Sequence, residues 1–300
     1  AEDAAEGGRA GGPAAQAAVR SGGQAWALSL AASLPSGIAT PSQLRHLAAC
    51  SGDGIGEVPP ERWAVEAALA GVEEVVGRRV RHGGFLSGAE RFDNARFGVS
   101  PAEAAAVDPQ QRLLLERGYE ALHSAGMDKA ALGGSLAGVF LGIAANDWQS
   151  VAAQSAAGKS VYAATGGSMS VASGRLSFVL GLQGPCVSYD TACSAALVAS
   201  HAALRGLQLH ECNTGLVAAA NLVLLPAASV ACGMAGLTSL LGRCHAFDRR
   251  ADGYARSEAC SSLVMQRSGG GAAGCARLAG SCVRQDGRSA SLTAPNGRAQ

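Results

Sequence analysis

The sequence predicts an α/β fold with a largely buried sheet, and two observations support this class. Short apolar segments typical of strands alternate with amphipathic or alanine-rich segments typical of helices over most of the chain. Hydrophobic residues make up 48% of the 300 residues and charged residues 16%, so a substantial core is expected. Aromatic residues make up only 4%, and we therefore expect this core to consist mainly of alanine, valine and leucine.

The first elements are recognised by an apolar run and by capping residues. Residues 25–34 form an apolar run that predicts a buried strand. Residues 43–50 are predicted to form a helix with Ser42 as its N-cap. Ser100 followed by Pro101 predicts the start of another helix, because proline is well tolerated at the first helical position.

The clearest helix is predicted over residues 109–124. There Leu113, Leu114, Tyr119 and Leu122 recur at helical spacing and form one apolar face, with charged side chains opposite. The later elements are assigned in the same way: strands over 137–143, 186–189, 215–225, 256–266 and 276–283, and helices over 171–180 and 195–207.

Charge and cysteine content argue against several partners and cofactors. The net charge of +1 gives no electrostatic reason to expect nucleic acid or an anionic membrane as a partner. Charged or polar residues interrupt every apolar run before it reaches the length of a membrane span. The nine cysteines are odd in number and contain no C-x-x-C pair, so neither a disulfide framework nor a metal site is predicted. Eight of them are expected to be small buried residues in a reducing compartment.

The remaining cysteine, Cys193, is the candidate nucleophile. It lies between the strand predicted over 186–189 and the helix predicted over 195–207, which places its thiol at a helix N-terminus. Unpaired N–H groups and the helix dipole give that position a partial positive charge, which favours the thiolate over the thiol. Because the thiolate is the nucleophile that acyl transfer needs, Cys193 is predicted to be catalytic.

Five ordered motifs resemble those of the β-ketoacyl synthases, most closely the ketosynthase domains of modular polyketide synthases. They are VDPQQRLLLE at 107–116, GRLS at 174–177, DTACS at 190–194, FDRRADGY at 247–254 and, within 286–297, DGRS followed by LTAPNG. Any one of these motifs can arise by chance, whereas five in the same order make coincidence improbable.

This resemblance implies a thiolase-like layered fold of two similar α/β halves. The amino-terminal half, which carries the nucleophile, is expected to be complete over residues 24–254, and residues 255–300 are expected to begin a truncated carboxy-terminal half. Residues 1–23 are rich in alanine and glycine and are predicted to be a flexible leader. The resemblance also implies a homodimer, an acyl carrier protein as partner, and no cofactor other than the phosphopantetheine of that carrier.

The chemistry that the resemblance implies is a decarboxylative condensation. Cys193 would take an acyl group from a carrier thioester, and the carbanion formed from a malonyl-type carrier thioester would attack the acyl-cysteine. Ser194, at the helix start, is a candidate oxyanion donor through its backbone amide. Thr293 and Asn296 belong to the LTAPNG motif and are candidate residues of the acyl or pantetheine channel.

Other ionisable residues receive no catalytic role. The two histidines of the family belong to motifs downstream of LTAPNG, and none of the six histidines present lies in such a motif. Asp252 and Glu258 are interpreted as structural carboxylates that pair with an arginine nearby in the sequence: Arg249, Arg250 or Arg256.

Three functions therefore remain open. The first is a β-ketoacyl synthase, or the amino-terminal part of one, that makes a fatty acid or a polyketide. The second is a catalytically incomplete ketosynthase-like scaffold that binds the carrier. The third, a cysteine-dependent thioester hydrolase, needs a base that the motifs do not supply. The expected compartment is the cytoplasm, with a plastid as the alternative.

Overall fold

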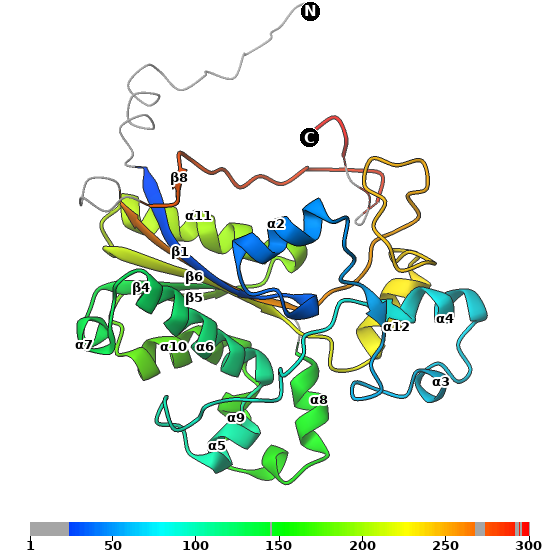
Figure 1. Cartoon of the computed structure of the whole chain (residues 1–300), viewed down its shortest axis with the longest axis horizontal. Coiled ribbons are helices and arrows are strands. Elements are labelled where there is room, and N and C mark those ends of the chain that lie inside the picture. Colours follow the sequence, from blue (N-terminus) through cyan, green and yellow to red (C-terminus); the bar gives the residue numbers. More distant parts are fainter. Residues whose placement is uncertain (1–23, 145, 268–273, 292–293, 295, 300) are drawn as a thin grey trace, which may run out of the picture.

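A six-stranded mixed sheet forms the centre of the computed structural model, which describes residues 24–144, 146–267, 274–291, 294 and 296–299 (Figure 1). The strand order is β5-β4-β6-β7-β1-β8, in which β5, β4 and β6 are parallel and the other neighbours antiparallel. The bounds are β1 Ala25–Ser33, β4 Ala137–Ile143, β5 Cys186–Tyr189, β6 Thr214–Asn221, β7 Ala259–Arg267 and β8 Ala276–Leu278. The predicted α/β class is confirmed.

Helices cover both faces of this sheet (Figure 1). One face packs against α6 (Pro109–Ser124) and α10 (Met169–Leu180), and the other against α11 (Ala195–Gln208). All seven residues of β4 are buried, as expected for a central strand with helices on both sides. The two apolar clusters that result consist mainly of leucine, alanine and valine, in agreement with the composition.

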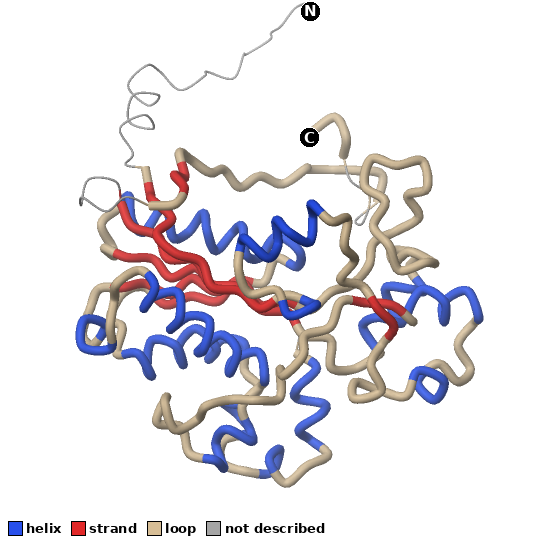
Figure 2. The backbone as a smooth tube through the Cα atoms, viewed as in Figure 1, coloured by secondary structure: helices blue, strands red, loops and turns tan. Residues whose placement is uncertain are grey.

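Shorter elements surround the sheet (Figure 2). They are α2 Pro41–Ala49, α3 Val65–Ala68, α4 Glu74–Val80, α5 Pro101–Ala106, α7 Lys129–Leu132, α8 Asp147–Ala153, α9 Ala163–Gly166, α12 Ala227–Met234, the 3-10 turns Pro35–Gly37, Ala157–Lys159 and Ala192–Ser194, and the strand pair β2 Gly56–Glu57 and β3 His82–Gly83. Helix α12 packs against α4 to one side of the sheet. Within the described residues, no helix combines the length and apolar character needed to cross a membrane.

Most predicted elements agree with the observed ones, and α6, β4 and β5 have the predicted bounds. The predicted N-cap of α2 was wrong: the cap is Thr40, not Ser42. The Thr40 hydroxyl accepts the N–H of Gln43, and the Gln43 side chain accepts the N–H of Thr40, which completes a capping box. Pro41 then occupies the first helical position, one residue earlier than Ser42.

The sheet extends beyond the boundary that we expected at residue 254. Strand β7 pairs with β6 on one side and with β1 on the other, and β8 pairs with the start of β1. The strands after residue 254 therefore complete the sheet of the first half and do not start a separate one. The leader predicted over 1–23 lies outside the described residues.

One buried hydrogen-bond network explains two of the sequence motifs. Arg175 of the GRLS motif donates from Nε to the side-chain oxygen of Gln111 in α6 (2.7 Å) and pairs with Glu103 through Nη1 (2.5 Å). The Gln111 amide in turn donates to the carbonyl of Gly166 (3.0 Å). These hydrogen bonds join α5, α6, α9 and α10, and they give the buried polar groups of the network their partners.

A buried carboxylate caps α6. Asp108 accepts the backbone N–H of Gln110 (2.8 Å) and is almost fully buried. Burial raises the pKa of Asp108 to about 6, and this effect outweighs the hydrogen bonds from Gln110 and the nearby Arg112 guanidinium, which act in the opposite direction.

Candidate active site

The candidate nucleophile lies on a tight turn between a strand and a helix. Strand β5 ends at Tyr189, and the Asp190 carboxylate accepts the N–H of Ala192 (3.0 Å), which closes the turn. Ala192 has a φ of +52°, a left-handed conformation that costs an alanine about 1 kcal/mol or more. Cys193 follows in a single 3-10 turn and α11 begins at Ala195, so the exposed Cys193 lies at a helix N-terminus, as predicted.

A glycine on the neighbouring strand lets the start of α11 approach the sheet. A Cβ added to Gly142 of β4 would lie 2.6 Å from the backbone nitrogen of Ala196 and 2.7 Å from the carbonyl carbon of Ala195. Real Cβ atoms do not approach backbone atoms so closely. Gly142 is therefore required for the present position of the helix start that follows Cys193.

Ser194 contributes to the turn itself. Its hydroxyl donates to the Thr191 carbonyl (2.9 Å) and lies 3.0 Å from the Thr191 hydroxyl, and its backbone N–H also donates to the Thr191 carbonyl (3.2 Å). These bonds hold the segment that carries Cys193 in one conformation. The Ser194 amide thus already has an acceptor within the turn. The role of this amide as an oxyanion donor stays a prediction.

Three residues in contact with one another were not predicted as site residues: Tyr254, Cys232 and Arg256. Cys232 on α12 lies 3.6 Å from the Tyr254 hydroxyl and 3.4 Å from Nη1 of Arg256. Burial raises the pKa of Tyr254, and the contact with Cys232 and the proximity of Cys193 act in the same direction. Tyr254 belongs to the ADGY motif, which could have identified it as a candidate site residue. Nothing in the sequence indicated such a role for Cys232.

The ADGY segment is held by backbone bonds to the segment after α12. The N–H of Tyr254 donates to the Leu237 carbonyl (3.0 Å), and the N–H of Ser239 donates to the Tyr254 carbonyl (3.0 Å). Gly253 has a φ of +142°, and a Cβ there would lie 2.4 Å from the carbonyl carbon of Thr238. Tyr254 is therefore fixed beside Cys232 by the backbone on both sides of it.

A buried ion pair lies just beyond this segment. Glu258, with a fully buried side chain, accepts two bonds from the Arg62 guanidinium (2.9 and 3.1 Å) and the backbone N–H groups of Leu86 (2.7 Å) and Val223 (3.0 Å). The structural role predicted for Glu258 is confirmed, but the predicted partner was wrong. The partner is Arg62, because the fold brings a distant loop against β7.

Two further predicted site residues cannot be assigned to the site. Thr293 lies outside the described residues. Asn296 donates from its side chain to the carbonyls of Asp286 (3.2 Å) and Arg288 (3.1 Å), and it therefore holds a turn within the DGRS–LTAPNG segment. The channel role of both residues stays a prediction.

The expectation that the other eight cysteines are buried was wrong for most of them. Only Cys212 and Cys260 are buried, Cys232 is half-buried, and five are exposed: Cys50, Cys186, Cys244, Cys275 and Cys282. The exposed cysteines lie in loops, at a helix end and at the start of the edge strand β5. Burial raises the pKa of Cys212 to about 11 and that of Cys260 to about 12, which favours the unreactive thiol.

This geometry defines a layered α/β protein with an exposed cysteine at a strand-to-helix turn. An exposed cysteine sulfur can reach and attack a thioester carbonyl. The fold is that of the thiolase-like class.

The chain belongs to the β-ketoacyl synthase family. The model of the β-ketoacyl synthase N-terminal domain matches residues 28–269. The chain is 42% identical over 272 residues to polyketide synthase GfsB of Streptomyces halstedii, which corresponds to 89% of this chain and 5% of that protein. It is also 38% identical over 278 residues to the mycocerosic acid synthase-like polyketide synthase of Mycolicibacterium smegmatis, covering 91% of this chain and 13% of that protein.

Solved structures agree with this assignment. The ketosynthase from module 6 of the bacillaene synthase of Bacillus subtilis superposes with a TM-score of 0.82 at 29% identity, over 92% of this chain and 46% of that one. The OzmH KS7 oxazolomycin ketosynthase domain of Streptomyces albus superposes with a TM-score of 0.74 at 27% identity, over 82% and 43%. The chain thus spans a little under half the length of these ketosynthases.

Proposed function

We propose that Cys193 accepts an acyl group from a carrier thioester and holds it for a decarboxylative condensation in polyketide synthesis. The observation that carries this proposal is the position of Cys193, exposed on the turn between β5 and α11. Polyketide synthesis is favoured over fatty-acid synthesis because the relatives named above are polyketide synthases and ketosynthases.

The step assigned to this chain is the acyl transfer. The Cys193 thiolate attacks the thioester carbonyl, a new carbon–sulfur bond forms, and the pantetheine sulfur leaves as a thiolate that takes up a proton. In the second step, a malonyl-type thioester loses carbon dioxide, its carbanion attacks the acyl carbonyl, and the Cys193 thiolate is released.

Partners and compartment belong to the same proposal. The acyl group arrives on the phosphopantetheine of an acyl carrier protein, and the chain needs no cofactor of its own for the transfer. We also propose a homodimer through β5, which is one of the two edge strands of the sheet. Exposed apolar side chains next to this edge, Val187 on β5 and Phe178 on α10, support that contact. The cytoplasm remains the proposed compartment.

Incubation with a short acyl-pantetheine thioester tests the acyl transfer. Intact mass is expected to rise by one acyl group, and peptide mapping is expected to place that group on Cys193. Cys193→Ala should abolish the adduct, whereas Cys50→Ala, which removes another exposed thiol at the end of α2, should leave it unchanged. Acylation spread evenly over the exposed cysteines would contradict the proposal.

A second measurement separates the condensing enzyme from the scaffold. Addition of a malonyl-carrier thioester to the acylated protein is expected to give the β-ketoacyl product in the intact synthase. Normal carrier binding with no acyl-cysteine at position 193 would instead support the catalytically incomplete scaffold.

A further inference from the structure

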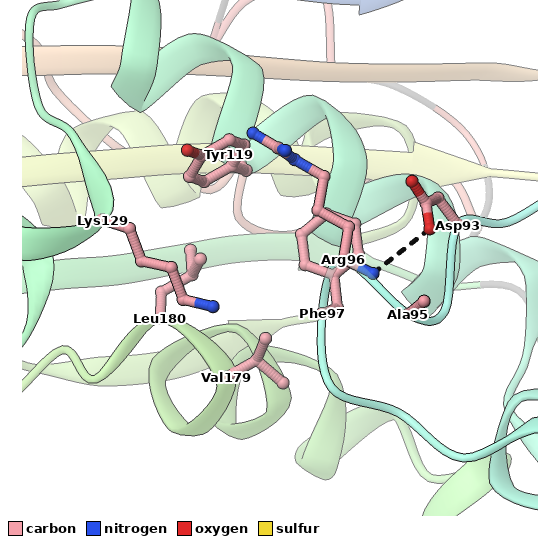
Figure 3. A pocket seen from close by; sticks show the side chains of 8 residues that line it. All are labelled: Asp93, Ala95, Arg96, Phe97, Tyr119, Lys129, Val179 and Leu180. Atoms are coloured by element: carbon pink, nitrogen blue, oxygen red, sulfur yellow. Dashed lines mark hydrogen bonds between the residues drawn. The ribbon is translucent and has the colours of Figure 1, made fainter.

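A cavity lies on the opposite side of the sheet from α11. It has a volume of about 440 Å³, and its lining comes from the loop before α5, from α6, from α7 and from the end of α10 (Figure 3). Leu180 in this lining precedes the amino-terminal end of β5, whereas Cys193 follows its carboxyl-terminal end. The cavity is therefore separate from the candidate active site.

Two cations line this cavity without an acidic partner. The guanidinium of Arg96 lies 4.9 Å from the centre of the Tyr119 ring, and Lys129 reaches into the cavity on the side of Val179 (Figure 3). Among the residues that the structure describes, neither Arg96 nor Lys129 has a carboxylate within ion-pair distance. The one carboxylate in the lining, that of Asp93, accepts the backbone N–H of Arg96 (3.2 Å).

Aromatic and aliphatic side chains form the rest of the lining. Phe97 stacks on Phe92 with the ring centres 5.5 Å apart and meets the Tyr119 ring edge-on at 6.2 Å. These contacts fix the loop that carries Arg96. On the other side, Val179 and Leu180 supply an aliphatic wall.

The two sides of the cavity are also held together by the backbone. The N–H of Gly134, just after α7, donates to the carbonyl of Gly181 at the end of α10 (2.8 Å). Lys129 on α7 is therefore kept near Val179 and Leu180. A cavity of this size, lined by both apolar side chains and a few polar groups, has the volume of a small-molecule site.

We propose that this cavity binds a small organic carboxylate with an aromatic or aliphatic body. Its carboxylate lies between Arg96 and Lys129, and its body packs against Phe97, Tyr119 and Leu180. Charge-assisted hydrogen bonds from the two cations give the preference for an anion, and the apolar wall gives the preference for a hydrophobic body.

Calorimetric titration with 4-phenylbutyrate tests the proposal, with the neutral 4-phenylbutanamide as the matched ligand. One molecule of the acid is expected to bind per chain at sub-millimolar concentration, and the amide about tenfold more weakly. Arg96→Gln and Lys129→Gln should each weaken binding of the acid about tenfold. Lys159→Gln, which changes the other lysine of the chain, should leave it unchanged.

A substitution that is expected to strengthen binding of the acid provides a further test. Asp93→Asn keeps an acceptor for the Arg96 N–H and removes the negative charge from the lining, so it is expected to tighten binding of the acid. Cys193→Ala should bind as the wild type does, which makes this proposal independent of the one for acyl transfer. Equal affinity for acid and amide, or tighter binding of triglutamate than of 4-phenylbutyrate, would overturn the proposal.

Discussion

Replacement of Glu258 by alanine is expected to cost about 3–5 kcal/mol of unfolding free energy. The change would leave the Arg62 guanidinium, only 15% exposed, without its carboxylate, and the N–H groups of Leu86 and Val223 without an acceptor. A buried charge without a partner is costly, and so is each buried donor without an acceptor. Since single domains are stable by about 5–15 kcal/mol, the loss would be a large fraction of the total.

Urea denaturation of the wild type and the variant measures this loss. Glu258→Gln keeps an acceptor oxygen of similar shape and is expected to lose less, so it provides a folded variant if the alanine variant does not fold. The matched control is Glu66→Gln, which breaks the exposed Glu66–Arg81 pair and should leave the denaturation midpoint unchanged. Equal midpoints for Glu258→Ala and Glu66→Gln would show that the buried pair does not hold β7 to the loop.

Gly142→Ala is expected to have the second largest effect, on stability and on the reactivity of Cys193 together. The added methyl group meets the backbone of Ala195 and Ala196 at 2.6–2.9 Å, and no side-chain rotation relieves a contact with backbone atoms. Overpacking of this kind costs about 1–3 kcal/mol. The start of α11 must move away from β4, and the turn that presents Cys193 must move with it.

The control for this change is Gly174→Ala on α10. A Cβ at Gly174 would have open space around it, so the substitution is expected to stabilise the protein by about 0.5–1 kcal/mol through helix propensity alone. Denaturation and the alkylation rate of Cys193 should be measured for both variants. An unchanged alkylation rate in a destabilised Gly142→Ala protein would mean that the close approach of α11 does not tune the cysteine.

Local sequence patterns predicted the elements on which the site is built. The apolar run at 137–143 gave the bounds of β4, because buried parallel strands are continuously apolar. The short run at 186–189 gave the bounds of β5, although this strand lies at an edge of the sheet and is partly exposed. The position of Cys193 followed from the break between a strand pattern and a helix pattern, so its turn was predictable as well.

Features that depend on distant segments could not be predicted in this way. Glu258 and Arg62 are 196 residues apart in the sequence, and only the packed fold brings them together. The same holds for Cys232 beside Tyr254, and for the cavity that joins Arg96 to Lys129 from separate elements. The exposure of five further cysteines was missed because small apolar residues carry no local signal of their position.

The reactivity of Cys193 relative to the other eight cysteines tests the central claim most directly. The native protein is treated with a limiting amount of iodoacetamide at neutral pH, and the labelled peptides are quantified over time. The exposed cysteines Cys50, Cys244, Cys275 and Cys282 control for accessibility, and the buried Cys212 and Cys260 set the lower limit. Cys193 is expected to react faster than every member of the exposed set, because it alone of them lies at the N-terminal end of a helix. A rate for Cys193 within the range of that set would contradict the account.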